Sequence, residues 1–397
     1  MSFRHRLSTA LSGAERVLPL PSLVRPAVRL GIDLIDDGPA PPPAPASEVR
    51  LATLDRKPSP PNYTEYAKTL ATPAKTGPTG TETVRADLPV TYVWGYHSER
   101  ADLRALYEKS KDLMWNARTD LAWSTSVDPE SPVVVPDLLN PLFGTDVWRK
   151  LDPKRELPNL RRHVASYLIS NFLHGEQGAL LATSQIVNCA PTMDAKMYAA
   201  AQVYDEARHV EAYDRYLREK LELVYPVSPY LKQLLDTILE DSRWDFKYLG
   251  MQIMVEGVAL AAFGLIHQSS EEPLIHKITE MIMQDEARHV AFGVLSLRDT
   301  FREMKPSDLR DREDFILESS RLLYDRFLAQ EVWEQCGLPK AECQAAVDKS
   351  PLMAVFRKLL FSKIVPNTKR LGLLTPYVRK GFEDLGVIEF ENHEASA

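Results

Sequence analysis

Apolar residues recur at helical rather than strand spacing through the middle of the chain, and prolines divide this region into long segments. Each segment is rich in Ala, Leu, Glu, Met and Arg, which favour a helix, and is long enough for several turns. Prolines are expected where helices end. We therefore predict four long helices in an antiparallel bundle. Between Pro158 and Pro306 the prolines are Pro191, Pro226, Pro229 and Pro273, leaving segments 159–190, 192–225, 230–272 and 274–305.

Shorter helical patterns flank the predicted bundle, and the period-two alternation of a strand is almost absent. The fold class expected from these patterns is all-α. We divide the chain into an irregular and helical part at 47–157 that packs on the bundle, a bundle core at 158–306, and C-terminal helices with a tail at 307–397. The flanking helical patterns lie at 99–122, 310–334 and 352–371.

The segment 1–46 has a composition of its own. GPAPPPAPA at 38–46 is typical of an extended, solvated linker. Two interpretations of the basic residues before it remain open: an extension that docks loosely on the protein, or a segment that makes weak contact with an anionic membrane surface. Prolines at 19, 21 and 26 interrupt a helix and favour the first. The basic residues are Arg4, Arg6, Arg16, Arg25 and Arg29, against one acid, Glu15.

Composition and charge exclude several classes of function. Of the 397 residues, 44% are hydrophobic and 26% charged, as in a globular protein. The net charge of −7 argues against a nucleic-acid partner, which usually needs a basic face. The three cysteines form neither a CxxC metal motif nor an even disulfide set, so we expect a reducing, cytoplasmic compartment. We predict no transmembrane helix, because no run of 18 apolar residues occurs.

The sequence DEARHV occurs twice, at 205–210 and at 285–290. Residues i and i+3 of a helix share a face, so Glu206 points the same way as His209, and Glu286 the same way as His289. One such pair is more often a surface feature than a metal site. Two identical copies on separate helices favour metal binding.

Two further carboxylates lie in apolar surroundings on the other two predicted helices. Glu256 is one of two polar residues in MQIMVEGVALAAFGLI at 251–266, and Glu176 lies in ISNFLHGEQGALLATSQIV at 169–187. A helix that is apolar all round should be buried, and a buried carboxylate is costly unless a cation compensates it. A metal site in a bundle core takes one carboxylate from each of these two helices.

The spacing of these residues indicates an internal repeat. Glu176 and Glu206 are 30 residues apart, and so are Glu256 and Glu286. The second set follows the first by 80 residues, which indicates an internal repeat of two related helical hairpins. The alternative is a bundle whose buried Glu and His form salt bridges with the arginines of the two motifs, but it explains neither the equal spacing nor the duplication.

We predict a dinuclear metal centre where the hairpins meet. Asp205 and Asp285 are placed to accept the second imidazole N–H of a ligand His from the opposite hairpin, which fixes the tautomer of that His. Arg208 and Arg288 then compensate the Asp charges. Two carboxylates and one imidazole per metal suit iron or manganese better than a thiolate-seeking metal. The predicted ligands are Glu176, Glu206, His209, Glu256, Glu286 and His289.

These motifs resemble those of the ferritin-like di-iron carboxylate proteins, in which a Glu is followed at this same distance by DExRH, twice. The resemblance covers about 159–305. It implies a ferritin-like four-helix bundle with flanking helices, two iron ions (Fe/Fe, or Mn/Fe), and an O2-activating oxygenase that hydroxylates or N-oxygenates a small organic or acyl substrate. Radical-generating ribonucleotide reductase small subunits, ligand-binding oxidases and ferritin-like iron-handling proteins share the motif and are the alternatives.

A few positions distinguish members of the group. Hydroxylases and desaturases usually carry a Thr where this chain has Ala259 and Leu260. Arylamine N-oxygenases resemble the chain in length but add a His at the position of Ile282. Ribonucleotide reductase small subunits carry a Tyr at the position of Tyr213, but usually an Asp in place of Glu176. Tyr213, one turn after the first ligand His, is our candidate catalytic residue, with core packing as the alternative.

The resemblance also implies partners. The chain has no nucleotide-binding fingerprint and no iron–sulfur cysteine set, so we expect an external electron donor, a reductase or a ferredoxin, beside O2 and a small-molecule substrate. We expect a homodimer, the commonest closed symmetry. Gly250, Gly257 and Gly264 recur every seven residues and predict a close approach of helices. The candidate cavity residues are Phe172, Leu173, Leu180, Leu260, Phe263, Met283 and Tyr213.

Overall fold

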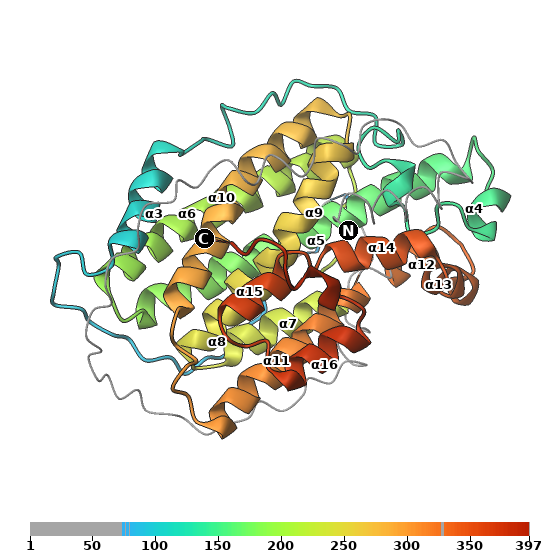
Figure 1. Ribbon diagram of the computed structural model, residues 1–397. Coiled ribbons are helices and arrows are strands. Elements are labelled where there is room, and N and C mark those ends of the chain that lie inside the picture. Colours follow the sequence, from blue (N-terminus) through green and yellow to red (C-terminus); the bar gives the residue numbers. More distant parts are fainter. Residues whose placement is uncertain (1–73, 76, 79, 327–328, 397) are drawn as a thin grey trace. The chain divides into compact units, whose positions relative to one another are not determined.

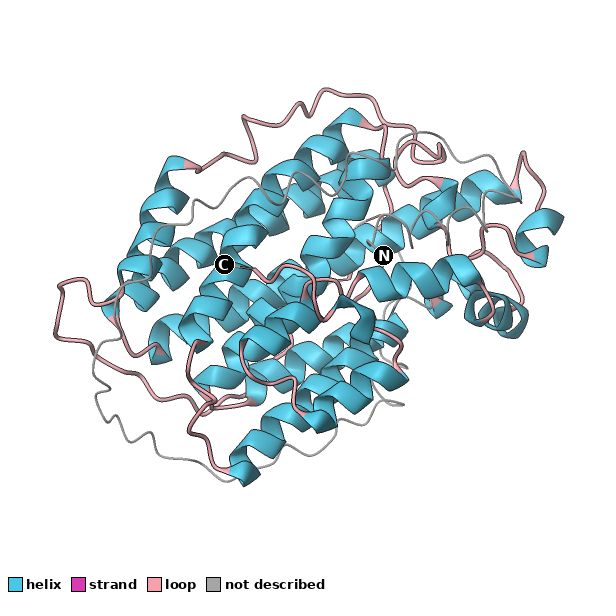
Figure 2. Cartoon of the chain, viewed as in Figure 1, coloured by secondary structure: helices cyan, strands magenta, loops and turns pink. Residues whose placement is uncertain are grey.

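The computed structural model describes residues 74–396 apart from 76, 79, 327 and 328 (Figure 1). The predicted extension and linker at 1–46, with the membrane contact considered for it, lie outside these residues, as does the beginning of the 47–157 part. The described residues form helices joined by loops, without a strand beyond one antiparallel bridge between Ala74 and Val224 (Figure 2). The predicted all-α fold class is confirmed.

Four helical segments carry the middle of the chain, as the prolines predict. The first two pack along each other, and so do the last two, so each hairpin of the repeat is a pair in space. Thr192 caps the second segment by accepting the N–H of Ala195, and Pro273 begins the fourth, where no N–H is needed. The segments are α5 (Glu156–Cys189), α6 (Met193–Tyr216) with a π-helical end at Leu217–Leu221, α8 (Trp244–Tyr248) continued through a π-helical stretch at Leu249–Val255 into α9 (Glu256–Ser269), and α10 (Pro273–Leu297).

The prediction of a single helix over 230–272 is wrong. α7 (Pro229–Glu240) ends at Asp241, where the backbone becomes extended, and the chain resumes as α8 after Arg243. The Asp241 carboxylate accepts the backbone N–H of Arg243 at 2.8 Å and also binds its guanidinium. Short acidic side chains compete in this way with the hydrogen bonds of a helix. As a result α7 packs between α5 and α11 (Pro306–Asp325) instead of extending α9.

Two other predicted helices end before the next proline. The 192–225 helix ends at Leu221 because Glu222 has a left-handed φ of 50°. The 274–305 helix ends at Leu297 because Arg298 has a non-helical ψ of 128°, and Asp299 with a φ of 69° follows it. A left-handed residue does not continue a right-handed helix. The helical pattern at 99–122 is reduced to α3 (Ala101–Asp112), which is followed by a loop.

The helices outside the core are shorter and more numerous than predicted. The 310–334 pattern is divided between α11 and α12 (Gln330–Gln335), and the 352–371 pattern between α14 (Pro351–Leu359) and α15 (Ile364–Arg370). The sequence pattern does not predict α13 or α16, because helices this short depend on packing more than on intrinsic propensity. These elements are η2 (Asp137–Leu139), α4 (Asp146–Lys150), α12 (Gln330–Gln335), α13 (Lys340–Asp348), α14 (Pro351–Leu359), α15 (Ile364–Arg370), α16 (Pro376–Asp384) and η6 (Ile388–Phe390).

The glycines of the third bundle segment differ in how closely other helices approach them. A Cβ on Gly250 would lie 2.5 Å from Ile238 of α7, and one on Gly257 would lie 3.2 Å from α15, so close approach is confirmed at these two positions. At Gly264 the nearest atom would be 3.8 Å away, an ordinary contact, and the prediction is wrong there.

The helical segment Trp244–Ser269 is long and apolar enough to suit a membrane span by those two criteria alone. However, 72% of its most apolar window is buried inside the protein, and it carries Glu256 and Gln252 in the core. A helix that is hydrophobic all round is equally expected at the centre of a large core. Its packing therefore accounts for its composition.

Candidate metal centre

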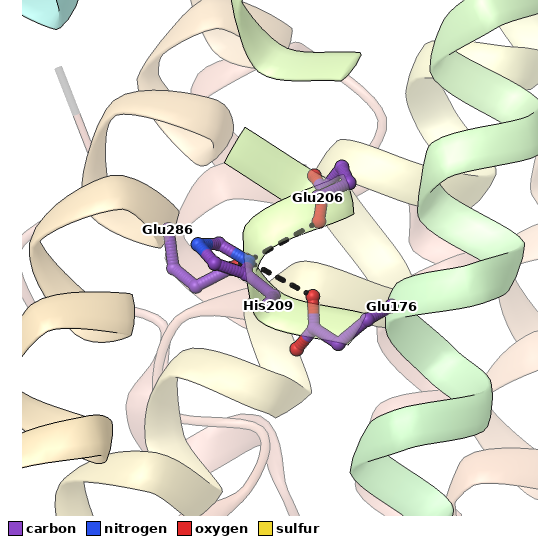
Figure 3. A group of neighbouring side chains, drawn as sticks. All are labelled: Glu176, Glu206, His209 and Glu286. Carbon is purple, nitrogen blue, oxygen red and sulfur yellow. Dashed lines mark hydrogen bonds and ion pairs between the residues drawn. The ribbon is translucent and has the colours of Figure 1, made fainter. Parts of the chain in front are cut away.

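Six acidic and imidazole side chains from four helices meet in the core. Figure 3 shows the first group of them, Glu176, Glu206, His209 and Glu286. All six are at least 95% buried. Their possible ligand atoms form two groups, each within 4.8 Å of one another, and Glu206 belongs to both groups. Two adjoining groups with a shared carboxylate are the arrangement of a dinuclear centre. The groups are Glu176, Glu206, His209 and Glu286, and Glu206, Glu256 and His289.

Both histidines approach the carboxylates with Nδ1. His209 Nδ1 lies 3.1 Å from Glu176 Oε2 and 3.3 Å from Glu206 Oε2, and His289 Nδ1 lies 3.1 Å from Glu206 Oε1. Glu286 Oε1 lies 3.3 Å and 3.5 Å from the two Nδ1 atoms. Glu206 and Glu286 therefore lie between the imidazoles, where each carboxylate is within 3.5 Å of both Nδ1 atoms.

Each imidazole turns Nε2 toward an aspartate of the opposite hairpin. His209 Nε2 lies 3.0 Å from Asp285 Oδ2, and His289 Nε2 lies 3.2 Å from Asp205 Oδ2. An acceptor at Nε2 favours the tautomer that carries its hydrogen there and leaves the Nδ1 lone pair available to a cation. The distances agree with the cross-hairpin pairing expected from the sequence.

The two arginines of the motifs pair with these aspartates. Arg208 contacts Asp205 and lies 3.3 Å from Asp285, while Arg288 contacts Asp285 and lies 3.4 Å from Asp205. Within the described part of the chain, no ion pair joins either arginine to the four buried glutamates. The salt-bridge alternative, in which these arginines compensate the glutamates, therefore does not describe this core.

Trp115 belongs to the centre although no motif points to it. It lies in the loop after α3 and donates its indole N–H to Asp285 Oδ2 at 2.8 Å. Its carbonyl accepts from Arg208 Nη1 at 2.8 Å, and its ring stacks beside that of His209, with centroids 6.2 Å apart. No sequence signal reveals it, because the loop is docked on the bundle only by the tertiary fold.

Gln202 is a second contact that the motif analysis missed. Its amide donates to Glu206 Oε1 at 3.0 Å and to Glu256 Oε1 at 2.8 Å, so it links two helices. Its place one turn before Glu206 was an available signal, since i and i+4 share a face. The residue 80 positions later is Ile282, which is fully buried, so the two hairpins differ at this point.

Glu256 occupies a special place in its helix. The π-helical stretch at Leu249–Val255 ends immediately before it, and α9 begins with it. A π-helical turn inserts extra chain into the helix and so changes the direction of the residues around it, and such turns are frequent at functional sites. This local geometry turns Glu256 toward Gln202 and the second group.

The electrostatics of the cluster fit a pair of cations. Burial, followed by the Glu286 carboxylate, raises the pKa of Glu176 and of Glu256 well above the usual range. Within the described residues, Oε2 of Glu206 and Glu256, both oxygens of Glu286 and Nδ1 of His289 have no hydrogen-bond partner. Buried carboxylates without partners are costly unless a cation compensates them. Their oxygens, together with imidazole nitrogen, form a ligand set that suits iron or manganese.

A cavity of about 20 Å³ adjoins the carboxylates. This is room for about one water molecule. Phe172 and Phe263, both predicted, line it, and so do Asn171 and the buried Arg326, which the sequence analysis did not anticipate. The other predicted cavity residues do not line it: Leu173, Leu180, Leu260, Met283 and Tyr213.

Tyr213 is fully buried beside the cluster. Its ring centroid lies 5.7 Å from that of Phe172 and 5.9 Å from that of Phe263. Burial, and then the Glu176 carboxylate, raise the pKa of the phenol well above its usual value. Its hydroxyl has no hydrogen-bond partner among the described residues. Tyr213 is therefore an uncharged phenol in an aromatic cluster, and its catalytic role stays a prediction.

Comparison with known proteins gives one family match. Residues 97–372 match the model of the family described as p-aminobenzoate N-oxygenase AurF, a range that includes all six clustered residues. No curated protein matches the chain. Two solved structures are similar to this chain. One is a tyrosine-to-phenylalanine mutant of R2-like ligand-binding oxidase with an anaerobically reconstituted Mn/Fe cofactor. It is 16% identical to this chain, the match covers 65% of this chain and 93% of that chain, and the TM-score is 0.39. Dimanganese(II)-NrdF of Streptococcus sanguinis is 14% identical, with 73% and 98% covered and a TM-score of 0.47.

Proposed function

The chain belongs to the p-aminobenzoate N-oxygenase AurF family, and from this premise we propose that it oxidises the amino nitrogen of an aromatic amine with O2. It is an oxidoreductase of the di-iron oxygenase type with a ferritin-like helical fold. The Ile282 position, where the arylamine N-oxygenases of the resemblance carry a His, does not place the chain outside the family. The observation that carries the proposal is the pair of buried carboxylate and histidine groups that share Glu206.

We assign the six clustered residues to two metal ions. Glu176 and His209 would hold one ion and Glu256 and His289 the other, while Glu206 and the remaining carboxylate, Glu286, lie between the two imidazoles and could serve both ions. When bound, the metal pair, Fe/Fe or Mn/Fe, supplies the electrons that reduce O2. The chain holds both imidazoles in the tautomer that binds through Nδ1, and its apolar helices exclude water from the site.

The cavity supports a substrate with an aromatic ring and an anionic substituent. Phe172 and Phe263 provide aromatic surface beside the carboxylates, and Arg326 is the cationic side chain in the described lining. Burial lowers the pKa of Arg326 to about 10, so the guanidinium stays charged near neutral pH. Since the cavity holds about one water, a ring enters only if lining side chains such as the two phenylalanines move.

The first oxidation has a simple balance: R–NH2 + O2 + 2 H+ + 2 electrons gives R–NHOH + H2O. The chain has no motif for a flavin, nicotinamide or iron–sulfur group, so a separate reductase or ferredoxin supplies the two electrons. We also propose a homodimer and a cytoplasmic location, which the three free cysteines support.

Metal loading followed by turnover tests the proposal. We expect about two iron ions per chain after anaerobic loading, and conversion of 4-aminobenzoate to its hydroxylamine on addition of O2 and reductant, detected by mass spectrometry. Glu206→Ala should lose both metals, because this carboxylate belongs to both groups. Two bound metals with no oxidation of any aromatic amine would contradict the substrate class, and one metal or none in wild type would contradict the assignment of the centre.

The role of Arg326 has its own readout. Arg326→Met should raise KM for 4-aminobenzoate about 10-fold or more relative to that for aniline, because a hydrogen bond to a charged group contributes roughly 1.5–3 kcal/mol. Arg326→Lys should restore part of the preference. An unchanged ratio between the two substrates would remove Arg326 from substrate binding.

A further inference from the structure

The cavity beside the carboxylates reaches the surface at two small residues. Of the described residues that line it, all are buried except Gly175 and Ala259, which are half-buried. Gly175 lies on α5 and Ala259 on α9. α5 packs along α6, and α9 along α10, so the two residues belong to different hairpins of the repeat. The cavity therefore opens between the hairpins, where one helix carries no side chain and the other a single methyl group.

Packing does not account for the glycine at this opening. Gly175 lies inside α5, where glycine is less favourable than alanine. A Cβ on Gly175 would meet no described atom within 4 Å, whereas a Cβ on Gly178 would lie 2.4 Å from Leu235 of α7. The approach of α7 therefore requires Gly178, but no neighbouring helix requires Gly175. What the glycine leaves free is space at the mouth of the cavity.

Two aromatic rings lie just inside the opening. Phe172 and Phe263 pack edge to face, with ring centroids 4.6 Å apart and planes at 81°. Phe172 comes three residues before Gly175, and Phe263 comes four residues after Ala259. Residues at these spacings share a helix face, so each ring adjoins the small residue of its own helix. A flat molecule that passes between the small residues meets aromatic surface at once.

Asn171 indicates what kind of molecule the cavity receives. Its side chain lines the cavity and is 4% exposed. Its amide nitrogen donates to the Tyr167 carbonyl at 2.9 Å, while its Oδ1 has no hydrogen-bond partner among the described residues. A buried acceptor of this kind is normally satisfied by a ligand or a water molecule. The N–H groups of an amine are suitable donors, and a plain hydrocarbon offers none.

We propose that an aromatic amine reaches the metal centre between α5 and α9, over Gly175 and Ala259, and that these two residues limit the substrate to the width of a single ring. The chemical class of the substrate rests on the proposed function, whereas the route rests on the lining of the cavity. One methylene group more or less in an apolar pocket typically changes specificity about 10–200-fold. Gly175→Ala adds one carbon at the opening, and Ala259→Gly removes one.

Two coloured ligands of iron test the route without the oxidation of an amine. Phenol and azide both give a visible absorption band when they bind to oxidised iron, but only phenol carries a ring. In stopped-flow absorption, Gly175→Ala should slow the appearance of the phenol band at least 10-fold and leave that of azide within twofold of wild type. Ala259→Leu should also slow phenol at least 10-fold, because its side chain fills the other half of the opening.

Gly264→Ala is the matched control for these variants. Gly264 is half-buried on α9 and does not line the cavity, and a Cβ on it would have its nearest neighbouring atom at 3.8 Å. Both glycine variants should melt at or above the temperature of wild type, because alanine favours a helix more than glycine does. Gly264→Ala should nevertheless admit phenol at the wild-type rate.

Four results would overturn the proposed route. They are the absence of a phenol band in wild type, phenol entry at the wild-type rate in both Gly175→Ala and Ala259→Leu, slowing of azide as large as that of phenol, and a lower melting temperature of Gly175→Ala. The last would mean that packing requires the glycine after all.

Turnover tests the limit on ring width. Relative to 4-aminobenzoate, Ala259→Gly should gain at least 10-fold in kcat/KM for 4-amino-1-naphthoate, an amine with two fused rings. An unchanged ratio between the two substrates would overturn the role of Ala259 in setting the width. A wild type that admits phenol at the expected opening but oxidises no aromatic amine would refute the proposed substrate class and support the route.

Discussion

Replacing Asp285 by Asn tests how the chain holds a metal-binding imidazole in place. Asp285 Oδ2 accepts hydrogen bonds from His209 Nε2 at 3.0 Å, Trp115 Nε1 at 2.8 Å and Arg208 Nη2 at 3.3 Å. An amide keeps one acceptor oxygen and places a donor where the second oxygen was. If its oxygen faces His209, its NH2 group faces the guanidinium of Arg288. If the amide turns over, its NH2 group faces the N–H donors of His209, Trp115 and Arg208 instead.

The expected loss can be bounded from these contacts. A neutral acceptor makes a hydrogen bond about half as strong as a charged one, and loss of such a partner typically costs about 10–100-fold in metal affinity. This corresponds to about 1.4–2.7 kcal/mol. Asp205 Oδ2 lies 3.2 Å from His289 Nε2, and among the described residues no tryptophan donates to Asp205. Asp205→Asn should therefore lose less, near the 10-fold end.

A competition titration of Fe(II) or Mn(II) against a coloured chelator measures these affinities. The matched control is Asp245→Asn, because buried Asp245 binds Arg312 at 2.8 Å and 3.1 Å and makes no hydrogen bond to the cluster. We expect it to lower the free energy of unfolding and to leave metal affinity at the wild-type value. If Asp285→Asn bound metal within twofold of wild type, the position of the His209 imidazole would not depend on this carboxylate. If Asp205→Asn lost more metal affinity than Asp285→Asn, the hydrogen bond from Trp115 would make no contribution to metal affinity.

Three further predictions follow from other parts of the molecule. Gly293→Ala should destabilise the protein by about 1–3 kcal/mol, because the new Cβ would lie 2.4 Å from Gln252 Cβ. Its control is Gly264→Ala, whose Cβ would have its nearest neighbouring atom at 3.8 Å and which should be neutral or slightly stabilising in a thermal melt. Burial lowers the pKa of Lys247 to about 8, below its usual 10.5, so between these two pH values the unfolded chain binds more protons than the folded protein. The free energy of unfolding of wild type should therefore rise relative to that of Lys247→Met as the pH rises from 8 to 10.5. No such rise would mean that the amine is not desolvated. Tyr213→Phe should keep both metals and O2 consumption if the ring only packs the core. A stable tyrosyl signal in electron paramagnetic resonance of wild type, absent from the variant, would instead assign Tyr213 the radical role.

Much of the core was determined by sequence patterns that act over short distances. An i, i+3 pair such as Glu206 and His209 shares a helix face whatever surrounds the helix, and the repeated spacing of 30 and 80 residues predicted which four helices meet. The structure brings these predicted residues into one cluster. Prolines likewise predicted most helix boundaries, because a missing N–H disrupts a helix locally.

What the sequence did not determine depends on contacts between distant segments. The break at Asp241 depends on whether its carboxylate binds Arg243 or leaves the helix intact, and periodicity does not distinguish these outcomes. Trp115 reaches Asp285 across 170 residues, and Arg326 lines the cavity from beyond the repeated helices. Such contacts have no sequence period, because they form only when packing of the apolar helix faces brings the loops onto the bundle, and so the tertiary structure alone decided them.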